Sequence, residues 1–130
     1  MDMKLELVPL PVADPERSLA FYTEKVGFHL DHDVQPGNGM RIIQLTPPGS
    51  ACSIVFGTGM GNEVIPGSVK NLHLVVEDVT KVRQLLLDRG VELSDINDMG
   101  GVKYVYFADP DRNSWALQEV PPRIREASQK

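Results

Sequence analysis

The chain has 130 residues, of which 42% are hydrophobic and 24% charged, the composition of a globular domain rather than of a disordered or collagen-like chain. A net charge of −5 and the lack of any concentration of Lys or Arg argue against a nucleic-acid partner. The single cysteine, Cys52, allows no internal disulfide, and no stretch reads as a signal peptide or as a membrane span of about 20 apolar residues. We therefore expect a cytoplasmic protein with no membrane partner.

The first expected helix begins after Asp14 and ends at Gly27. Residues 4–12 form an extended, apolar-rich run that precedes it. Aspartate is a good N-cap, Pro15 suits the first turn because it needs no N–H there, and glycine commonly ends a helix with positive φ. Apolar residues recur along this segment at the spacing of one helix face: Leu19, Tyr22 and Val26.

The same order returns in the second half of the chain. Residues 70–76 read as a strand, Asp78 can cap a second helix, and Gly90 can end it. The buried face of this helix is expected to carry Val79, Val82 and Leu86. Asp14 and Asp78 are 64 residues apart, and Gly27 and Gly90 are 63 apart. One strand–helix unit is therefore written twice.

Three strand-like stretches follow each helix, separated by turns rich in Gly, Pro, Asp and Asn. They are residues 28–34, 40–46 and 51–57 in the first half, and residues 91–97, 102–108 and 114–120 in the second. We expect an α+β fold of two βαβββ modules, residues 4–57 and 70–120, with residues 58–69 as a linker and 121–130 as a tail. Short turns between consecutive strands indicate mixed, mostly antiparallel sheets, each covered by its helix on one face. The other, concave faces are expected to enclose a ligand cleft.

Two stretches carry a resemblance to a known family. PVADPERSLAFY (11–22) with VGF (26–28) resembles the opening of vicinal-oxygen-chelate proteins, the glyoxalase/bleomycin-resistance/dioxygenase superfamily. FADPDRNSW (107–115) resembles the turn into their last strand, and the match extends over residues 4–121. The family usually has Gly where this chain has Arg112, so a positive φ there would carry a small strain. The resemblance implies that the whole chain is one such domain and that it forms a homodimer.

The resemblance also indicates where a metal would lie. Enzymes of the family hold a divalent ion with His, Gln or Glu side chains from the first and last strands of each module. Spacing carries these positions onto Leu7, Ser53, Asn71 and Ala116. Leu and Ala cannot bind a metal, and Ser and Asn are feeble neutral ligands. We therefore predict no metal and no other cofactor, although a register shift of one residue would bring in Glu6 and a shift of two would bring in His73.

Residues that share a strand face with these four positions are expected to line the cleft, because side chains alternate across a strand. The predicted ligand-binding residues are Gln44, Ser53, Asn71, His73, Tyr104, Trp115 and Gln118. His73 is also the candidate catalytic base, since imidazole exchanges a proton near neutral pH. A hydrogen-bonded structural role is the alternative for His73, and core packing is the alternative for Tyr104, Trp115 and their neighbour Tyr106. His29, Asp31, His32 and Asp33 are close in sequence, but alternation divides them between two faces, so we expect a solvated strand edge rather than a metal cluster.

Three functions remain open. The first is a binding protein that holds a small organic molecule without converting it, as drug-sequestering members of the family do. The alternative is a lyase or dioxygenase-type enzyme that uses a metal in shifted register, or His73 as a base. Without a metal, such an enzyme loses the Lewis acid that stabilises an enediolate. The third is a dimer whose cleft is filled by its own side chains.

Overall fold

The computed structural model describes residues 1–60 and 65–121. Residues 61–64 of the expected linker and residues 122–130 of the expected tail lie outside the described residues. None of the helices in the described part of the chain is long and apolar enough to cross a membrane.

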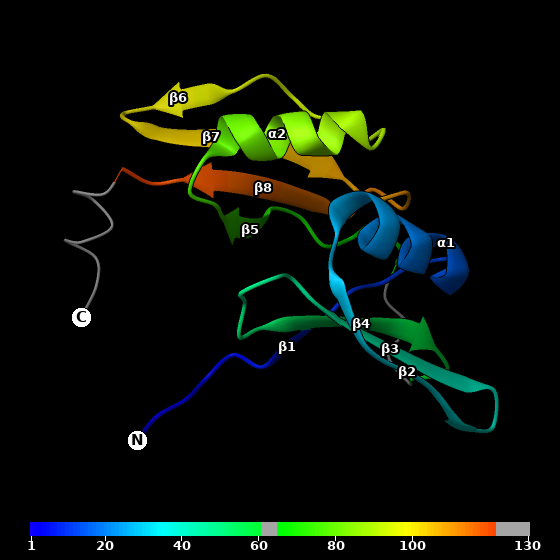
Figure 1. Cartoon of the computed structure of the whole chain (residues 1–130). Helices are drawn as coiled ribbons and strands as arrows, with labels where there is room; N and C mark the ends of the chain where they lie inside the picture. Colours follow the sequence, from blue (N-terminus) through cyan, green and yellow to red (C-terminus); the bar gives the residue numbers. More distant parts are fainter. Residues whose placement is uncertain (61–64, 122–130) are drawn as a thin grey trace. The chain divides into compact units, whose positions relative to one another are not determined.

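The chain divides into two compact units, each of which holds one sheet and one helical segment (Figure 1). The first unit comprises Met1–Val69 together with the turn Asp109–Asn113. The second comprises Lys70–Ala108 and the chain from Ser114 onward. The turn before the last strand thus packs with the first unit, although the strands on either side of it belong to the second.

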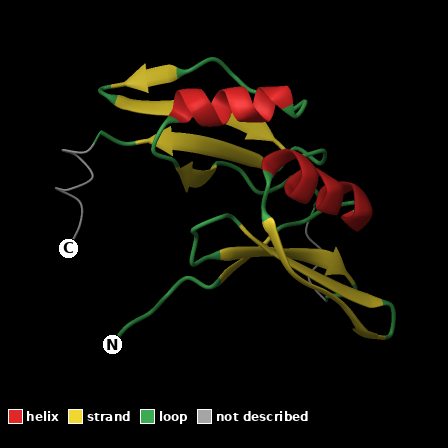
Figure 2. Cartoon of the chain, in the orientation of Figure 1, coloured by secondary structure: helices red, strands yellow, loops and turns green. Residues whose placement is uncertain are grey.

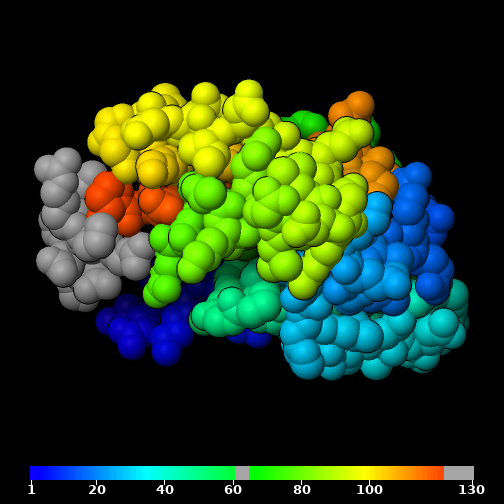
Figure 3. Space-filling model, turned by 45° about the horizontal axis from the view of Figure 1, so that its top comes forward, coloured from blue at the N-terminus to red at the C-terminus, as the bar shows by residue number. Residues whose placement is uncertain are grey.

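The first unit contains β1 (Leu7–Pro9), α1 (Pro15–Ala20), the π-helix η1 (Phe21–Val26), β2 (His29–Gly37), β3 (Met40–Thr46) and β4 (Ser53–Thr58). Its strands form a mixed sheet in the order β1-β4-β3-β2, in which β1 and β4 are parallel and the other neighbours are antiparallel. Every residue of β2 is exposed, and Figure 3 shows this edge segment in cyan at the surface.

The first helix begins where the sequence predicts, but its second half is wider than expected. The Asp14 carboxylate accepts the backbone N–H groups of Glu16 at 3.1 Å and Arg17 at 3.3 Å, as an N-cap does. The helix then continues as η1 and ends at Gly27, where φ is 94° and the N–H donates to the Tyr22 carbonyl at 2.9 Å. The apolar spacing predicted both ends of the helix and not this change of pitch.

The second unit contains β5 (Leu72–Val75), α2 (Val79–Asp88), β6 (Asn97–Met99), β7 (Val102–Ala108) and β8 (Ser114–Glu119). The strand order is β5-β8-β7-β6, again with one parallel pair, β5 with β8. Figure 2 shows α2 lying across this sheet, and the contacts of α2 are with β7 and β8. The two units therefore repeat one topology, as the duplicated sequence pattern predicts.

The prediction of a strand over residues 91–97 is largely wrong, because β6 begins only at Asn97. The preceding segment runs beside β7 without completing a ladder. Ser94 donates its N–H to the Tyr106 carbonyl at 3.0 Å, but the Tyr106 N–H donates to the Ser94 side-chain oxygen at 2.9 Å. A hydroxyl has replaced the backbone carbonyl that a β-ladder would use, and the regular strand is interrupted there.

Each sheet buries one face. The fully or almost fully buried side chains include Tyr22, Ile43, Leu45 and Phe56 in the first unit, and Val79, Leu86, Val105 and Leu117 in the second. Along each strand these positions alternate with residues on the opposite face of the sheet. The expected α+β fold of two βαβββ modules with mixed, curved sheets is confirmed, and the function is to be sought on the faces opposite these buried residues.

The turn at residues 109–113 is held by Asp109, which is 3% exposed. Its Oδ1 accepts the N–H groups of Asp111 and Asn113, each at 2.9 Å, and its Oδ2 accepts the Tyr22 hydroxyl at 2.7 Å. Arg112 has φ of 80°, so the strain expected where the family has glycine is present. The motifs that resemble a known family therefore meet as one packing unit.

Candidate functional site

One candidate surface is the face of the second sheet opposite α2, which we call the aromatic face. The direction of β8 defines it, because Trp115 is buried and Glu119 accepts the Val79 N–H at the start of α2 at 2.8 Å. Alternate residues of β8 therefore point the other way. By strand register that side carries His73, Tyr104, Tyr106, Ala116 and Gln118.

The side chains of the aromatic face contact one another. His73 Nδ1 lies 2.7 Å from Gln118 Oε1, and since a carbonyl oxygen only accepts, Nδ1 is the donor. The neutral imidazole then carries its lone pair on Nε2, and His73 is exposed. The Tyr104 ring lies edge-on to His73 at 6.0 Å between centroids and stacks on Tyr106 at 6.2 Å with an interplanar angle of 7°. The arrangement offers parallel aromatic planes beside one basic nitrogen and one amide.

Two predicted ligand-binding residues of the second unit lie apart from this group. Trp115 is only 2% exposed and stacks on Phe107 at 6.3 Å, on the side of the sheet that α2 covers. The Trp115 ring is therefore part of the core, which is the alternative role considered for it. Asn71 is exposed, precedes β5, has φ of 59° and donates its N–H to Ser114 Oγ at 2.8 Å. Its place outside the strand means that alternation does not fix its direction.

A second candidate surface is the corresponding side of the first sheet, which we call the polar face. Gln44 and Thr46 on β3 and Ser53 on β4 share this side, opposite the buried Ile43 and Leu45. Thr46 Oγ1 lies 2.6 Å from Ser53 Oγ. Gln44 and Ser53 are predicted ligand-binding residues, whereas no sequence pattern indicated Thr46.

Asp31 joins the polar face, and its role was missed as well. Its Oδ2 accepts the Thr46 hydroxyl at 2.5 Å and the Gln44 amide N–H at 3.2 Å. These bonds, chiefly the one from Thr46, hold the pKa of the Asp31 carboxyl below its ordinary value. Asp31 lies in an irregularity of the strand register, which alternation alone does not predict.

The segment His29–Asp33 was expected to form a solvated edge, and the structure distributes its acidic groups between two sets of partners. His29 Nε2 lies 3.9 Å from Asp31. Asp33 instead makes a two-point bond with Arg41, at 3.0 and 2.7 Å, and this bond lowers the pKa of Asp33. Among residues 1–60 and 65–121, no three His, Cys, Asp or Glu side chains lie close enough together to hold a metal ion.

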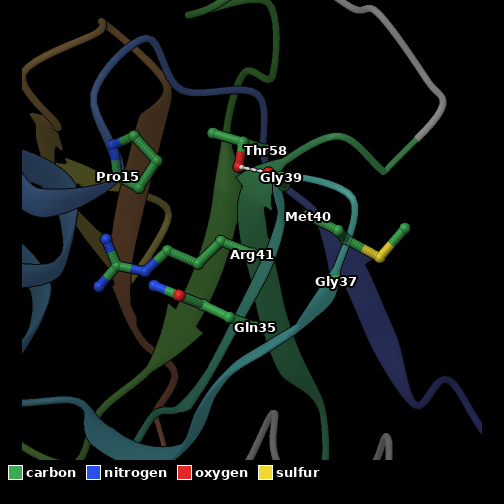
Figure 4. Close-up of a pocket in the computed structure, with 7 residues that line it drawn as sticks. All are labelled: Pro15, Gln35, Gly37, Gly39, Met40, Arg41 and Thr58. Atoms are coloured by element: carbon green, nitrogen blue, oxygen red, sulfur yellow. Dashed lines mark hydrogen bonds between the residues drawn. The ribbon is translucent and has the colours of Figure 1, made fainter.

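The first unit also contains a cavity of about 410 Å³ near the β2–β3 turn (Figure 4). Its lining consists of Pro15, Gln35, Gly37, Gly39, Met40, Arg41 and Thr58. The Arg41 guanidinium is bonded to Asp33 and Glu16, and these bonds raise the pKa of Arg41 further. The Thr58 hydroxyl donates to the Gly39 carbonyl at 3.0 Å. The strongest polar groups of the cavity are thus engaged within the protein, and none of the predicted site residues lines it.

The family model described as Glyoxalase/Bleomycin resistance protein/Dioxygenase superfamily matches residues 4–117 of the chain. The chain belongs to this superfamily. The resemblance seen in the two sequence motifs is therefore confirmed, and it extends over most of both units.

Several known proteins are similar to this chain over nearly their whole length. TnmS3, an antibiotic binding protein from Streptomyces sp. CB03234, is 32% identical with a TM-score of 0.82, covering 92% of this chain and 98% of TnmS3. A glyoxalase/bleomycin resistance protein from the same strain is 34% identical with a TM-score of 0.77, covering 89% and 100%. YetH of Bacillus subtilis (strain 168) is 28% identical over 123 residues, 92% of this chain and 100% of YetH.

In the first unit, the positions that would hold the superfamily's metal lack suitable donors. Leu7 lies opposite Ser53 in the β1–β4 register, as the spacing predicts, and is apolar. Ser53 is 5% exposed and its hydroxyl is bonded to Thr46. Glu6, the residue that a shift of one would bring in, precedes β1 and binds the Ser53 N–H through its backbone carbonyl at 2.9 Å. Neither strand supplies a carboxylate or imidazole in register.

In the second unit, His73 rather than Asn71 lies opposite Ala116 in the β5–β8 register. This is the shift of two residues that would bring His73 into place. Ala116 is fully buried and supplies no donor, and His73 Nδ1 is bonded to Gln118. One imidazole does not make a divalent metal site, which needs three or four ligands. The residues at these positions therefore do not fit the superfamily's metal.

Proposed function

We propose that this protein binds a small, planar organic molecule and releases it unchanged. The aromatic face carries the proposal, because Tyr104 and Tyr106 present parallel rings on which a flat ligand can stack. His73 and Gln118, bonded to each other beside these rings, would fix the orientation of the ligand through Nε2 and the amide nitrogen. In the first unit, Gln44 and Ser53 of the polar face are proposed as hydrogen-bonding residues for the same class of ligand.

Two observations support binding over catalysis. The metal positions hold Leu7, Ser53 and Ala116, which offer no Lewis acid site for the superfamily's enzymes. TnmS3, which is similar to this chain over 92% of its length, is described as an antibiotic binding protein. We infer a binding role of the same general kind, exercised in the cytoplasm by a homodimer. Analytical ultracentrifugation would test the homodimer, and a monomer at micromolar concentration would exclude it.

A second candidate function is metal-free proton transfer by His73. The specific observation is that Nδ1 donates to Gln118, which leaves the basic lone pair on Nε2 of an exposed imidazole. A ligand with an acidic C–H bond beside a carbonyl would be the substrate class. Deuterium exchange into such a ligand, lost in His73→Gln, would favour this function over simple binding.

Binding can be tested with naphthol as a planar probe, by calorimetry and by ligand-induced shifts of the melting temperature. Replacing Tyr104 or Tyr106 with leucine removes one stacking plane and should weaken binding by about two- to tenfold. Leu85→Ala is a matched control, since Leu85 is 47% exposed on α2, away from the aromatic face. Mass spectrometry should recover the probe unchanged. Equal affinity in the tyrosine variants and the control would rule out the aromatic face as the binding surface.

A further inference from the structure

Asp31 is the final acceptor of the hydrogen bonds on the polar face. Asp31 is placed by a β-bulge, an extra residue that bends a strand and redirects a side chain. The flanking residues of β2 pair in order with β3, and Asp31 is the one skipped between Leu30, which pairs with Leu45, and His32, which pairs with Gln44. The bulge lets the Asp31 carboxylate reach two side chains of β3.

An ionised carboxylate has no hydrogen to give, so both of its partners must donate. Thr46 has one hydroxyl hydrogen and gives it to Asp31 Oδ2. The 2.6 Å contact between Thr46 Oγ1 and Ser53 Oγ must then use the hydrogen of Ser53. Ser53 is left with lone pairs only. The chain of bonds Ser53 to Thr46 to Asp31 therefore turns the Ser53 hydroxyl into an acceptor.

Gln44 is oriented by the same carboxylate. Its amide nitrogen donates to Asp31 Oδ2 at 3.2 Å, which directs its carbonyl oxygen away from Asp31. Gln44 is half-buried, and we take its carbonyl oxygen as the acceptor offered to a ligand. Two acceptors, the Gln44 oxygen and the Ser53 hydroxyl, are thus set by one acidic residue that need not touch the ligand.

We propose that Asp31 is a positioning residue that makes the polar face of the first unit hydrogen-bond-accepting, so that this face selects ligands carrying an O–H or N–H donor. This inference rests on the proposed function, because it takes Gln44 and Ser53 as ligand-binding residues. It goes beyond that function by naming the chemical class of ligand and the residue that determines it.

The test compares two probes that differ only in the donor: naphthol and the methyl ether of naphthol. The wild-type protein should bind naphthol about tenfold more tightly than the ether, the effect of one hydrogen bond that the ether cannot donate. In Asp31→Ala no carboxylate accepts the Thr46 hydrogen, so Thr46 can donate to Ser53 and the Ser53 hydrogen is free to be donated to a ligand. The preference for naphthol should then fall to about twofold or less.

Asp33→Ala is the matched control, since Asp33 is an aspartate of the same strand that binds Arg41 instead of the polar face. It should keep the tenfold preference even if overall affinity changes. A merely structural role for Asp31 would weaken both probes equally and leave their ratio unchanged, which overturns the proposal. Ser53→Ala provides a second route if Asp31→Ala does not fold: it should weaken naphthol binding and spare the ether.

Tight binding of both probes without preference would overturn the role of Asp31 and leave the binding function standing. Failure of the folded wild-type protein to bind either probe would overturn the proposed function for planar ligands, and the selectivity with it. A naphthol preference that disappears in Asp31→Ala and persists in Asp33→Ala supports both.

Discussion

The hydroxyl of Tyr22 donates to Oδ2 of Asp109 over 2.7 Å, across 87 residues of sequence. Tyr22 is fully buried and Asp109 nearly so. The same carboxylate oxygen also accepts the Asn113 side-chain amide at 2.9 Å. This bond ties the helical segment to the turn before the last strand, which are the two stretches by which the sequence resembles the superfamily. Their similarity to relatives therefore reflects packing as much as function.

Removing this bond should destabilise the protein without altering ligand binding. We expect Tyr22→Phe to lower the free energy of unfolding by about 1–3 kcal/mol, because the buried Asp109 oxygen loses a donor. Urea denaturation measures the change. Tyr106→Phe removes a hydroxyl from a ring that is 37% exposed and should have little effect. Equal stability of the two variants would show that the buried bond contributes nothing.

The strained backbone at Arg112 gives a second prediction. Its φ of 80° favours glycine over any other residue. Arg112→Gly and Arg112→Ala lose the same long side chain, but only alanine keeps the strain. The glycine variant should therefore be about 1 kcal/mol more stable than the alanine variant. Thermal denaturation of the pair checks this, and an alanine variant that is the more stable would contradict it.

The pKa of Asp31 should depend on Thr46. The hydrogen bond from Thr46 is the main cause that lowers this pKa, so Thr46→Val should raise it toward the ordinary value. A lowered pKa stabilises the folded chain at pH values above the aspartate's unfolded pKa, and this stabilisation is lost as the pH falls through the folded pKa.

The variant should accordingly lose stability at neutral pH, and this pH-dependent part of the loss should vanish in acid. Carboxyl NMR titration measures the pKa, and denaturation at several pH values measures the stability. A matched measurement on Asp33, which depends on Arg41 instead, should show no change. An Asp31 pKa unaffected by the loss of the Thr46 hydroxyl would disprove the direction of the bond.

Metal analysis gives a fourth prediction. Because Leu7 and Ala116 offer no donor atoms, purified protein should hold less than one equivalent of zinc, manganese or nickel, and a chelator should not change its melting temperature. His73→Ala should leave the metal content unchanged. One equivalent of bound metal that is lost in His73→Ala would instead favour the enzyme alternative in shifted register.

The helix ends and several strand bounds could be predicted from the sequence, because they depend on residues that are neighbours along the chain. Asp14 and Gly27 set the ends of the first helix through capping and positive φ, and β3 and β7 have the predicted bounds. The strand predicted over residues 91–97 was largely wrong because a serine side chain took the place of a backbone carbonyl. A local sequence pattern does not predict which oxygen will accept the N–H of a residue on a neighbouring strand.

The sequence by itself determined the duplicated topology, because periodicity and capping are local properties. Its resemblance to the superfamily indicated the family and pointed to Leu7 and Ala116, side chains unsuited to a metal. Only the tertiary structure decided that Trp115 is core, that His73 pairs with Gln118, and that Asp31 reaches Thr46. These depend on which strands become neighbours and on a one-residue bulge. Both are set by packing across the sheet, which hydrophobic alternation along one strand does not specify.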